Sequence, residues 1–341
     1  MLRLYTDTKF LTEENRKKVF PLLFDLCYLK NSELQNYYEL TSDIYNSDVL
    51  IVPIDLNTFK KYSSEYKKIL SVSRSQNKPL WYYIAGDSDQ ISKIELGYEF
   101  RLGGHQSKLS NKVITIPSFI NDPYDQNLKV EFSVLNKLEK PSIGFVGYAD
   151  NSLITYMRGM GRLIFYSLIE RNFALLPMKE RFFYGVHRAK LLEILSRDNG
   201  LLTNFILRKK YRAGSSFGSE NRKITSDEFY HNIYENLFTF CIRGAGNFSV
   251  RFFQVLAMGR IPILFNTDCP LPLSDIIDWE KHILMVKDDM DFGLQITKFF
   301  DNHSEEELKT IQINNRQLWI THLERVNYFI KINQKFNYLL K

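Results

Sequence analysis

The sequence predicts an α/β protein with two parallel sheets, and two observations carry this prediction. Short apolar runs of strand length alternate with longer segments of helical periodicity, which is typical of a doubly wound parallel sheet. This alternation starts again after a polar stretch at 121–140 that contains Pro123. A chain of 341 residues is long enough for two domains of ordinary size.

The first half of the chain contains the elements of one such sheet. A helix is expected from Thr12 to about Leu29, because apolar side chains recur at helical spacing between residues 19 and 26. A polar helix is expected over 56–71. Strands are expected at 2–5, 48–54, 79–84 and 113–116. We therefore predict an N-terminal domain over 1–125 and a linker over 126–140.

The second half repeats the pattern. Helices are expected at 153–170 and 186–196, and strands at 142–146 and 201–207. The run after Ser304 is helical and continues, with a bend, to about Leu339. These elements predict a C-terminal domain over 141–320.

The most informative stretch of the second half runs from 237 to 265. An apolar run at 237–242 predicts a buried strand, and a second one follows at 261–265. Between them, apolar residues at helical spacing over 250–257 predict a helix, with Asn247 or Ser249 as its N-cap and Gly259 at its C-terminus. The turn before this helix, from Arg243 to Gly246, contains Gly244 and Gly246, and glycine can adopt backbone angles that other residues avoid.

A glycine turn that leads into a helix presents free N–H groups and the positive end of the helix dipole, which suits a phosphate. Arg243 precedes the turn, and Arg251 lies in the first turn of the helix. Their guanidinium groups could converge on one anion. The alternative is a structural corner whose arginines are solvated or paired with surface carboxylates.

The same stretch resembles the signature of a known enzyme family. The pattern R-G-x-G-x-x-S-x-R-F-x-x-x-L-x-x-G-R-I-P-I, here Arg243 to Ile263, is similar to that of the exostosin-type glycosyltransferases (glycosyltransferase family 47). The similarity extends through 267–272 to Trp279. It implies a GT-B architecture, in which two Rossmann-like domains face a central cleft and the final helix, here 321–341, packs back on the first domain.

The resemblance also implies a site for a nucleotide-sugar donor. The diphosphate would be held by Arg243, Gly244, Gly246, Asn247, Ser249 and Arg251. Residue 254 usually carries an acid that faces the ribose, but this sequence has Gln254 there, and an amide is a weaker partner for a hydroxyl. Asp268 is expected near the base and ribose of the donor, and so is Asp278 unless the two only cap a helix over 273–279.

The catalytic base is expected in the first domain. Asp87 follows the strand at 79–84 and would face the cleft, and His105 is the second candidate. The triplet Asp87-Ser88-Asp89 also has the D-x-D form of a metal–diphosphate motif. Because the phosphate site is expected in the other half of the chain, we predict no metal site and no cofactor besides the donor itself.

Composition limits the partners and the cellular location. The chain is 44% hydrophobic and 25% charged, as in a soluble globular protein. A net charge of +6 suits an anionic ligand or an anionic membrane face, and no zinc-finger spacing or RNA-binding motif predicts a nucleic acid partner. Three scattered cysteines, and the lack of a signal peptide or of 18 consecutive apolar residues, predict a cytoplasmic protein, with the inner face of the cell membrane as its place of work. The basic run 208–212 is read as a solvated face or as a contact with a lipid-linked phosphate or an anionic leaflet.

Together these features predict an inverting, metal-independent glycosyltransferase. Its donor would be a nucleotide sugar, with UDP as the expected nucleotide, and inversion follows from the resemblance. Its acceptor would be an oligosaccharide or lipid-linked glycan of the bacterial surface, such as lipopolysaccharide core, O-antigen or capsule. The alternatives are a fucosyltransferase-like GT-B enzyme that uses a GDP-sugar, a dinucleotide-dependent oxidoreductase, and a non-catalytic protein that binds nucleotide or glycan.

Overall fold

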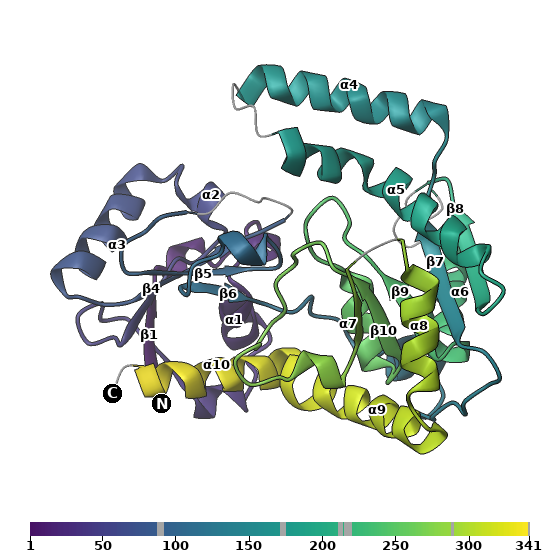
Figure 1. Cartoon of the computed structure of the whole chain (residues 1–341). Helices are drawn as coiled ribbons and strands as arrows, with labels where there is room; N and C mark the ends of the chain where they lie inside the picture. The colour runs from purple at the N-terminus through teal and green to yellow at the C-terminus, as the bar shows by residue number, and fades with distance from the viewer. Residues whose placement is uncertain (87–91, 171–174, 211–213, 215–219, 288–289, 340–341) are drawn as a thin grey trace. The chain divides into compact units, whose positions relative to one another are not determined.

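Two compact units make up the protein. The computed structural model describes residues 1–86, 92–170, 175–210, 214, 220–287 and 290–339 (Figure 1). Unit 1 contains Met1–Phe119, Pro270–Leu273 and Thr321–Lys341, and unit 2 contains Ile120–Cys269 and Ser274–Ile320. Each unit is built on its own parallel sheet. The predicted α/β class with two Rossmann-like sheets, which is the pair of domains in a GT-B architecture, is confirmed.

The sheet of unit 1 has six strands in the order β2-β1-β3-β4-β5-β6, and every pairing is parallel. The four strands that the sequence predicts are all present. The sequence did not predict the other two strands. The edge strand β2 has two exposed residues, and β5 contains the buried ion pair Glu99–Arg101, so neither shows the apolar run by which a buried strand is identified. The strands are β1 (Leu2–Thr6), β2 (Tyr38–Thr41), β3 (Val49–Ile51), β4 (Leu80–Ile84), β5 (Gly97–Arg101) and β6 (Val113–Thr115).

The helix expected over residues 12–29 is not continuous. A 3-10 turn spans Arg16–Lys18, the short helix α1 spans Pro21–Leu23, and a π-helical turn spans Phe24–Tyr28. Pro21 explains the break, because proline lacks a backbone N–H and disfavours helical angles in the residue before it. The helix expected over 56–71 is likewise divided, into α2 (Leu56–Phe59) and α3 (Ser63–Ser75).

The sheet of unit 2 has five parallel strands in the order β11-β10-β9-β7-β8. Renumbered from β7, the order is 2-1-3-4-5, which is also the order of the first five strands of unit 1. The direction of winding reverses between β7 and β9, and ligands of such sheets bind at this switch point, beyond the carboxyl ends of the strands. The strands are β7 (Ser142–Tyr148), β8 (Leu202–Arg208), β9 (Phe238–Cys241), β10 (Ile261–Phe265) and β11 (Leu284–Val286).

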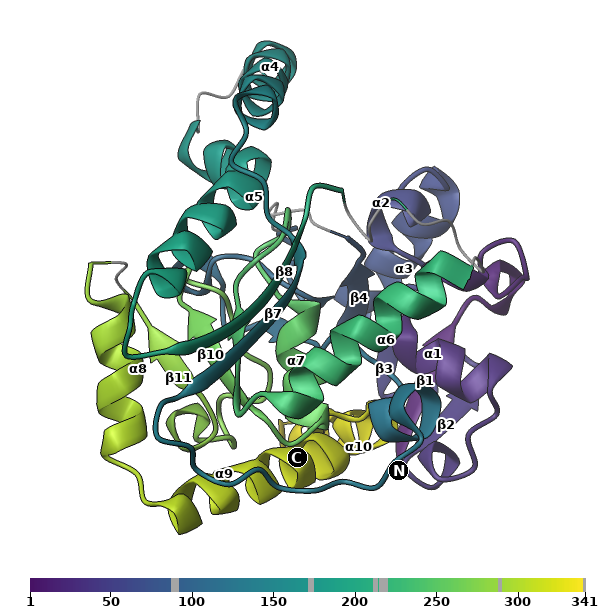
Figure 2. The same ribbon diagram turned by 90° about the vertical axis from the view of Figure 1, so that its right-hand side faces the viewer.

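Helices cover both faces of this second sheet (Figure 2). Side chains of α5 (Leu175–Ser196) and α8 (Phe292–Asp301) form one buried cluster with Ile143 and Phe145 of β7. The opposite face of β7 carries Gly144, where Asn232 of α6 (Glu220–Glu235) packs so closely that an added Cβ would lie 2.5 Å from its Oδ1. The sequence did not indicate α6, α8 or β11.

The stretch that the sequence singled out folds as expected. The helix α7 spans Val250–Ala257 between β9 and β10, and the predicted strand at 261–265 is confirmed. Gly259 follows the C-cap with a φ of 62°, the left-handed conformation that glycine supplies at a helix end. Gly244 and Gly246 are not among the residues with positive φ, so the turn does not need glycine for its backbone angles.

The chain ends in a bent pair of helices, as the sequence predicts. The helix α9 spans Glu305–Leu318 and begins with a capping box between Ser304 and Glu307. A π-helical turn at Trp319–Leu323 makes the bend, and α10 follows over Arg325–Leu339. Within unit 1, the Tyr38 hydroxyl donates to the carbonyl of Phe329 in α10 over 2.6 Å. The helix expected over 273–279 is absent, and this segment forms turns before a 3-10 helix at Trp279–Lys281.

A buried carboxylate in unit 1 makes stability depend on pH. Asp25 is 1% exposed, one of its oxygens accepts from Arg325 over 3.1 Å, and the other has no partner among the described residues. Burial outweighs the attraction of Arg325 and raises the pKa of Asp25 from 3.8 to about 6. The folded state therefore binds more protons than the unfolded state between these pH values, so this group lowers stability as the pH rises through that window.

We expect Asp25→Asn, which stays neutral, to remove this decline. Between pH 4 and pH 7 the wild type should lose about 2 kcal/mol more unfolding free energy than the variant. Urea unfolding at the two pH values measures the difference. Glu14→Gln, an exposed change in the same unit, should follow the wild type. An identical pH profile for Asp25→Asn and wild type would contradict the buried position of this carboxylate.

Candidate functional site

Arginines gather at the switch point of the second sheet. Arg251, from the first turn of α7, donates to the carbonyl of Val146 over 2.6 Å and to that of Phe240 over 3.4 Å. These carbonyls belong to β7 and β9, the two strands between which the winding reverses. A Cβ on Gly147 would lie 2.7 Å from the Arg251 guanidinium, so a glycine is needed at this close approach.

Arg188, from α5, also forms hydrogen bonds at the carboxyl ends of β7 and β9. It donates to the carbonyl of Tyr148 and to the carbonyl of Arg243, each over 2.8 Å. The guanidinium carbons of Arg188 and Arg251 lie 5.9 and 4.0 Å from the centre of the Phe145 ring. The two cations therefore share one aromatic side chain in the core of the unit.

The positive charge of this pair is not neutralised within the described part of the chain. Arg188 and Arg251 donate only to backbone carbonyls, neither forms an ion pair there, and the Nε of each has no hydrogen-bond partner. Burial, followed by repulsion from Arg188, lowers the pKa of Arg251 to about 9, and burial also lowers the pKa of Arg188. Buried charges are normally paired. An anion bound at this edge of the sheet would therefore be attracted by both guanidinium groups.

The turn from Arg243 to Ser249 lies against this pair. Arg243 is 4% exposed, and its side chain curls over the turn, donating to the carbonyls of Gly244 and Ala245 over 3.4 and 3.0 Å. The side chain of Asn247 is also buried and bonds to Thr267 after β10, both as donor and as acceptor. Two of the predicted diphosphate residues thus shape the turn itself.

Other parts of the turn are open to a ligand. A Cβ added at Gly244 would meet nothing within 4 Å. Ser249 occupies the N-cap position of α7, but its hydroxyl makes no capping bond. Gly246 is buried, and its N–H donates to no other residue in the described ranges. A small anion at this point could accept from the Gly246 N–H and the Ser249 hydroxyl beside the positive end of α7.

The predicted ribose and base residues also lie in unit 2. Gln254 donates to the hydroxyl of Tyr230 on α6 over 3.0 Å. Asp268 follows β10 with a φ of 60°, and its N–H donates to Asn266. Asp278 is exposed and pairs with Lys281 over 3.1 Å. Among these, only Asp268 is at the carboxyl edge of the sheet, where it follows β10.

The two predicted bases belong to unit 1. Asp87 lies outside the described residues, as do Ser88 and Asp89. His105 lies in the loop between β5 and β6 and immediately precedes a 3-10 turn at Gln106–Lys108. Within the described ranges, no group of three or more histidine, cysteine or acidic residues could hold a metal ion.

Sequence reasoning missed Arg188, and it did not single out the two tyrosines beside it. Tyr184 lies one turn before Arg188 on α5, its ring centre 5.4 Å from that guanidinium, and it meets Tyr148 of β7 edge-on at 5.9 Å. A signal was present: Arg188 falls four and seven residues before Leu192 and Leu195, on the apolar stripe of its helix. A charged residue on such a stripe indicates a buried role.

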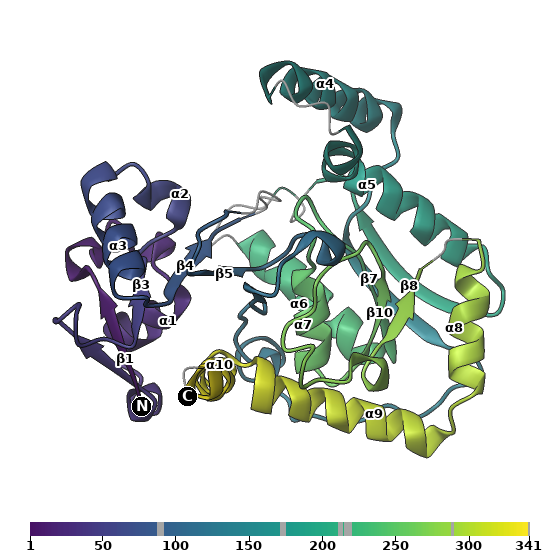
Figure 3. The same ribbon diagram turned by 60° about the vertical axis from the view of Figure 1, so that its left-hand side comes forward.

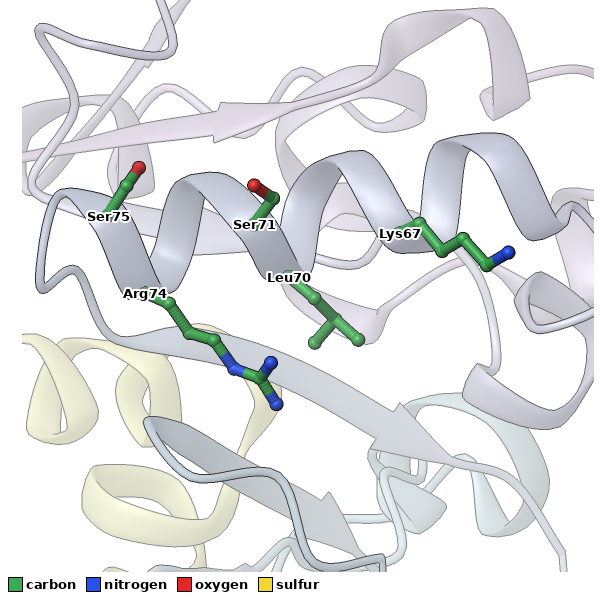
Figure 4. A pocket seen from close by; sticks show the side chains of 5 residues that line it. All are labelled: Lys67, Leu70, Ser71, Arg74 and Ser75. Atoms are coloured by element: carbon green, nitrogen blue, oxygen red, sulfur yellow. The ribbon is translucent and has the colours of Figure 1, made fainter.

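Two further surface features remain, and the first adjoins this site, because Arg208 of β8 lies beside Tyr148 of β7 in the sheet. In the basic run 208–212, Arg208 pairs with Glu228 over 2.6 Å, and 211–212 lie outside the described residues. Figure 4 shows a shallow hollow along α3 in unit 1, lined by Lys67, Leu70, Ser71, Arg74 and Ser75. All five residues come from a single helix, and none of them was a candidate.

Comparisons with known proteins do not name a family for the chain. No protein-family model matches it, and no curated protein matches it. Among solved structures it is similar to WaaG, "a glycosyltransferase involved in lipopolysaccharide biosynthesis", at 8% sequence identity and a TM-score of 0.31, over 89% of this chain and 80% of that one. A TM-score this low supports no inference about activity, and the exostosin resemblance stays a prediction.

Proposed function

We propose that the protein is a glycosyltransferase that takes a sugar from a nucleotide-diphosphate donor. One observation carries the proposal. Arg188 and Arg251 place two buried charges, which no described carboxylate compensates, at the switch point of the second sheet beside the open turn at Gly244. The leaving group of glycosyl transfer is a nucleoside diphosphate, which gains negative charge as the glycosidic bond breaks. Fixed donors and positive charge at that position stabilise the transition state.

In this proposal some residues contact the diphosphate directly, and others act on it from a distance through their charge. The Gly246 N–H and the Ser249 hydroxyl would contact the β-phosphate, while Arg188 and Arg251 would stabilise its charge from behind the turn. Half-buried Tyr148 and Tyr184 offer aromatic faces for the nucleobase or the sugar. Asp87 or His105 would accept the proton of the acceptor hydroxyl.

The finer parts of the proposal come from the exostosin resemblance. They are a UDP-linked donor, inversion at the anomeric carbon, independence from metal ions, and an acceptor among bacterial surface glycans. In this scheme Arg188 and Arg251, which have no carboxylate partner among the described residues, would supply the positive charge that a metal ion provides in other transferases.

A glycine substitution tests where the nucleotide binds. Gly244→Val places a side chain in the open space over the turn without backbone strain, so unfolding temperature should hardly change while affinity for the nucleoside diphosphate falls at least about tenfold. Titration calorimetry with UDP, GDP and UMP measures this. Gly161→Val is the matched control, since Gly161 also faces open space but lies on α4 (Leu153–Glu170).

The pattern of ligands decides between the donors. Tighter binding of UDP than of GDP and UMP supports the proposal, while preference for GDP supports the fucosyltransferase-like alternative. Release of nucleoside diphosphate from a panel of nucleotide sugars then separates an enzyme from a binding protein. If Gly244→Val binds the preferred nucleotide as tightly as Gly161→Val does, the diphosphate does not lie over this turn.

A further inference from the structure

The helix α4 exposes large apolar side chains to solvent. It follows β7 and packs beside α5, where the rings of Tyr156 and Phe183 lie 5.1 Å apart and a Cβ on Gly159 would come within 2.8 Å of the Phe183 ring. Figure 1 and Figure 3 show α4 next to α5 and away from the sheet of unit 2. Leu168 is 74% exposed, Met157 63% and Phe165 58%.

These side chains form one continuous surface. At the 100° per residue of an α-helix, the exposed apolar residues occupy an arc of roughly 180°. Gly159 lies outside this arc, on the side that meets α5. The residues of the arc, here called the α4 apolar arc, are Leu153, Ile154, Tyr156, Met157, Met160, Ile164, Phe165 and Leu168.

The two charged residues along the α4 apolar arc are both basic, and the acidic residue of α4, Glu170, is the last residue of the helix. Arg158 and Arg162 are exposed and follow each other at one edge of the apolar arc, and no acidic residue occurs from 153 to 169. An arc of this kind with arginines at its border is typical of helices that lie in a membrane interface, where long basic side chains reach the lipid phosphates. No described helix is long and apolar enough to cross a bilayer, so α4 would lie along the surface.

We propose that α4 docks the protein on an anionic lipid bilayer. The α4 apolar arc enters the boundary between headgroups and acyl chains, and Arg158 and Arg162 bind lipid phosphates at its edge. Charge complementarity selects this partner over a second copy of the chain. The charged residues along the arc are Arg158 and Arg162, so two α4 helices packed arc to arc would bring like charges together. The inference comes from α4 alone and does not rest on the proposed activity.

Sedimentation with vesicles tests the apolar part of the proposal. The full chain should sediment with vesicles of phosphatidylglycerol and phosphatidylcholine and much less with phosphatidylcholine alone. Met157→Ser/Phe165→Ser should weaken partitioning roughly 100-fold, about tenfold for each apolar side chain. The control Ile276→Ser/Ile313→Ser changes apolar residues of similar exposure (56% and 46%) elsewhere in unit 2 and should partition like the wild type.

Arg158→Gln/Arg162→Gln tests the charged part. Each lost charge should weaken binding to anionic vesicles about fivefold, and raising the salt concentration should weaken the wild type more than this variant. Since all four substituted side chains of α4 are exposed, unfolding temperatures should stay close to that of the wild type. The proposal is overturned if the full chain does not sediment with anionic vesicles or if the α4 variants bind these vesicles like the control. It is also overturned if sedimentation velocity shows a dimer of the wild type that the α4 variants abolish.

Discussion

Arg188→Met is expected to lower the affinity for a nucleoside diphosphate about 100-fold and to leave the affinity for the uncharged nucleoside unchanged. Arg188 is 8% exposed and has no carboxylate partner within the described ranges, so its charge acts at full strength on an anion bound at the switch point. Calorimetric titration of both ligands measures the difference. The nucleoside lacks the phosphates, so it separates loss of charge from loss of shape.

The residue just after this helix supplies the control. Arg197 follows α5, its side chain is 77% exposed and pairs with Glu193 of α5, and Arg197→Met should bind the diphosphate like the wild type. Methionine fills the space of the Arg188 stem and removes a desolvated charge, so the unfolding temperature of Arg188→Met should shift by only a few degrees even though two carbonyls lose a donor. Equal losses for diphosphate and nucleoside would mean that Arg188 only supports the fold.

The sequence predicted the fold best where apolar pattern and turn chemistry agree. The strand 261–265 and the helix 153–170 were predicted with their observed ends, and Gly259 was assigned to the end of α7. Prediction failed where the apolar pattern does not determine the structure. Pro21 breaks a helix that the apolar spacing favours, and in β5 the charged residues Glu99 and Arg101 are buried because they pair with each other.

The candidate site was predictable only in part. The motif located the turn and Arg251, but Arg243 donates to its own turn and Arg251 donates to strand carbonyls. The direction of a guanidinium depends on which carbonyls the sheet leaves open, and this follows from strand order rather than from local sequence. Arg188 is 55 residues from Arg243 along the chain and reaches it only because α5 packs across the ends of β7 and β9.

Gly259→Val should cost about 4 kcal/mol of unfolding free energy, because two effects add. A φ of 62° strains a residue with a side chain, most of all a β-branched one. The new Cβ would also lie 2.4 Å from the Phe132 ring and 2.9 Å from the carbonyl oxygen of Gln312. Urea unfolding measures the loss. Gly244→Val, the same change at a position with open space and no positive φ, should cost less than about 1 kcal/mol.

A double-mutant cycle separates the strain at Gly259 from the clash. Gly259→Ala keeps both effects in smaller form, and Phe132→Ala removes the ring that the new methyl group meets. The double variant should therefore be more stable than the sum of the single changes allows, by about 1 kcal/mol, while the cost of the positive φ remains. Strict additivity would contradict the packing of Phe132 on this turn. The helix α7 carries Arg251 and is joined to β10 through Gly259. Substitutions at Gly259 should therefore weaken diphosphate binding only if they shift the turn between α7 and β10.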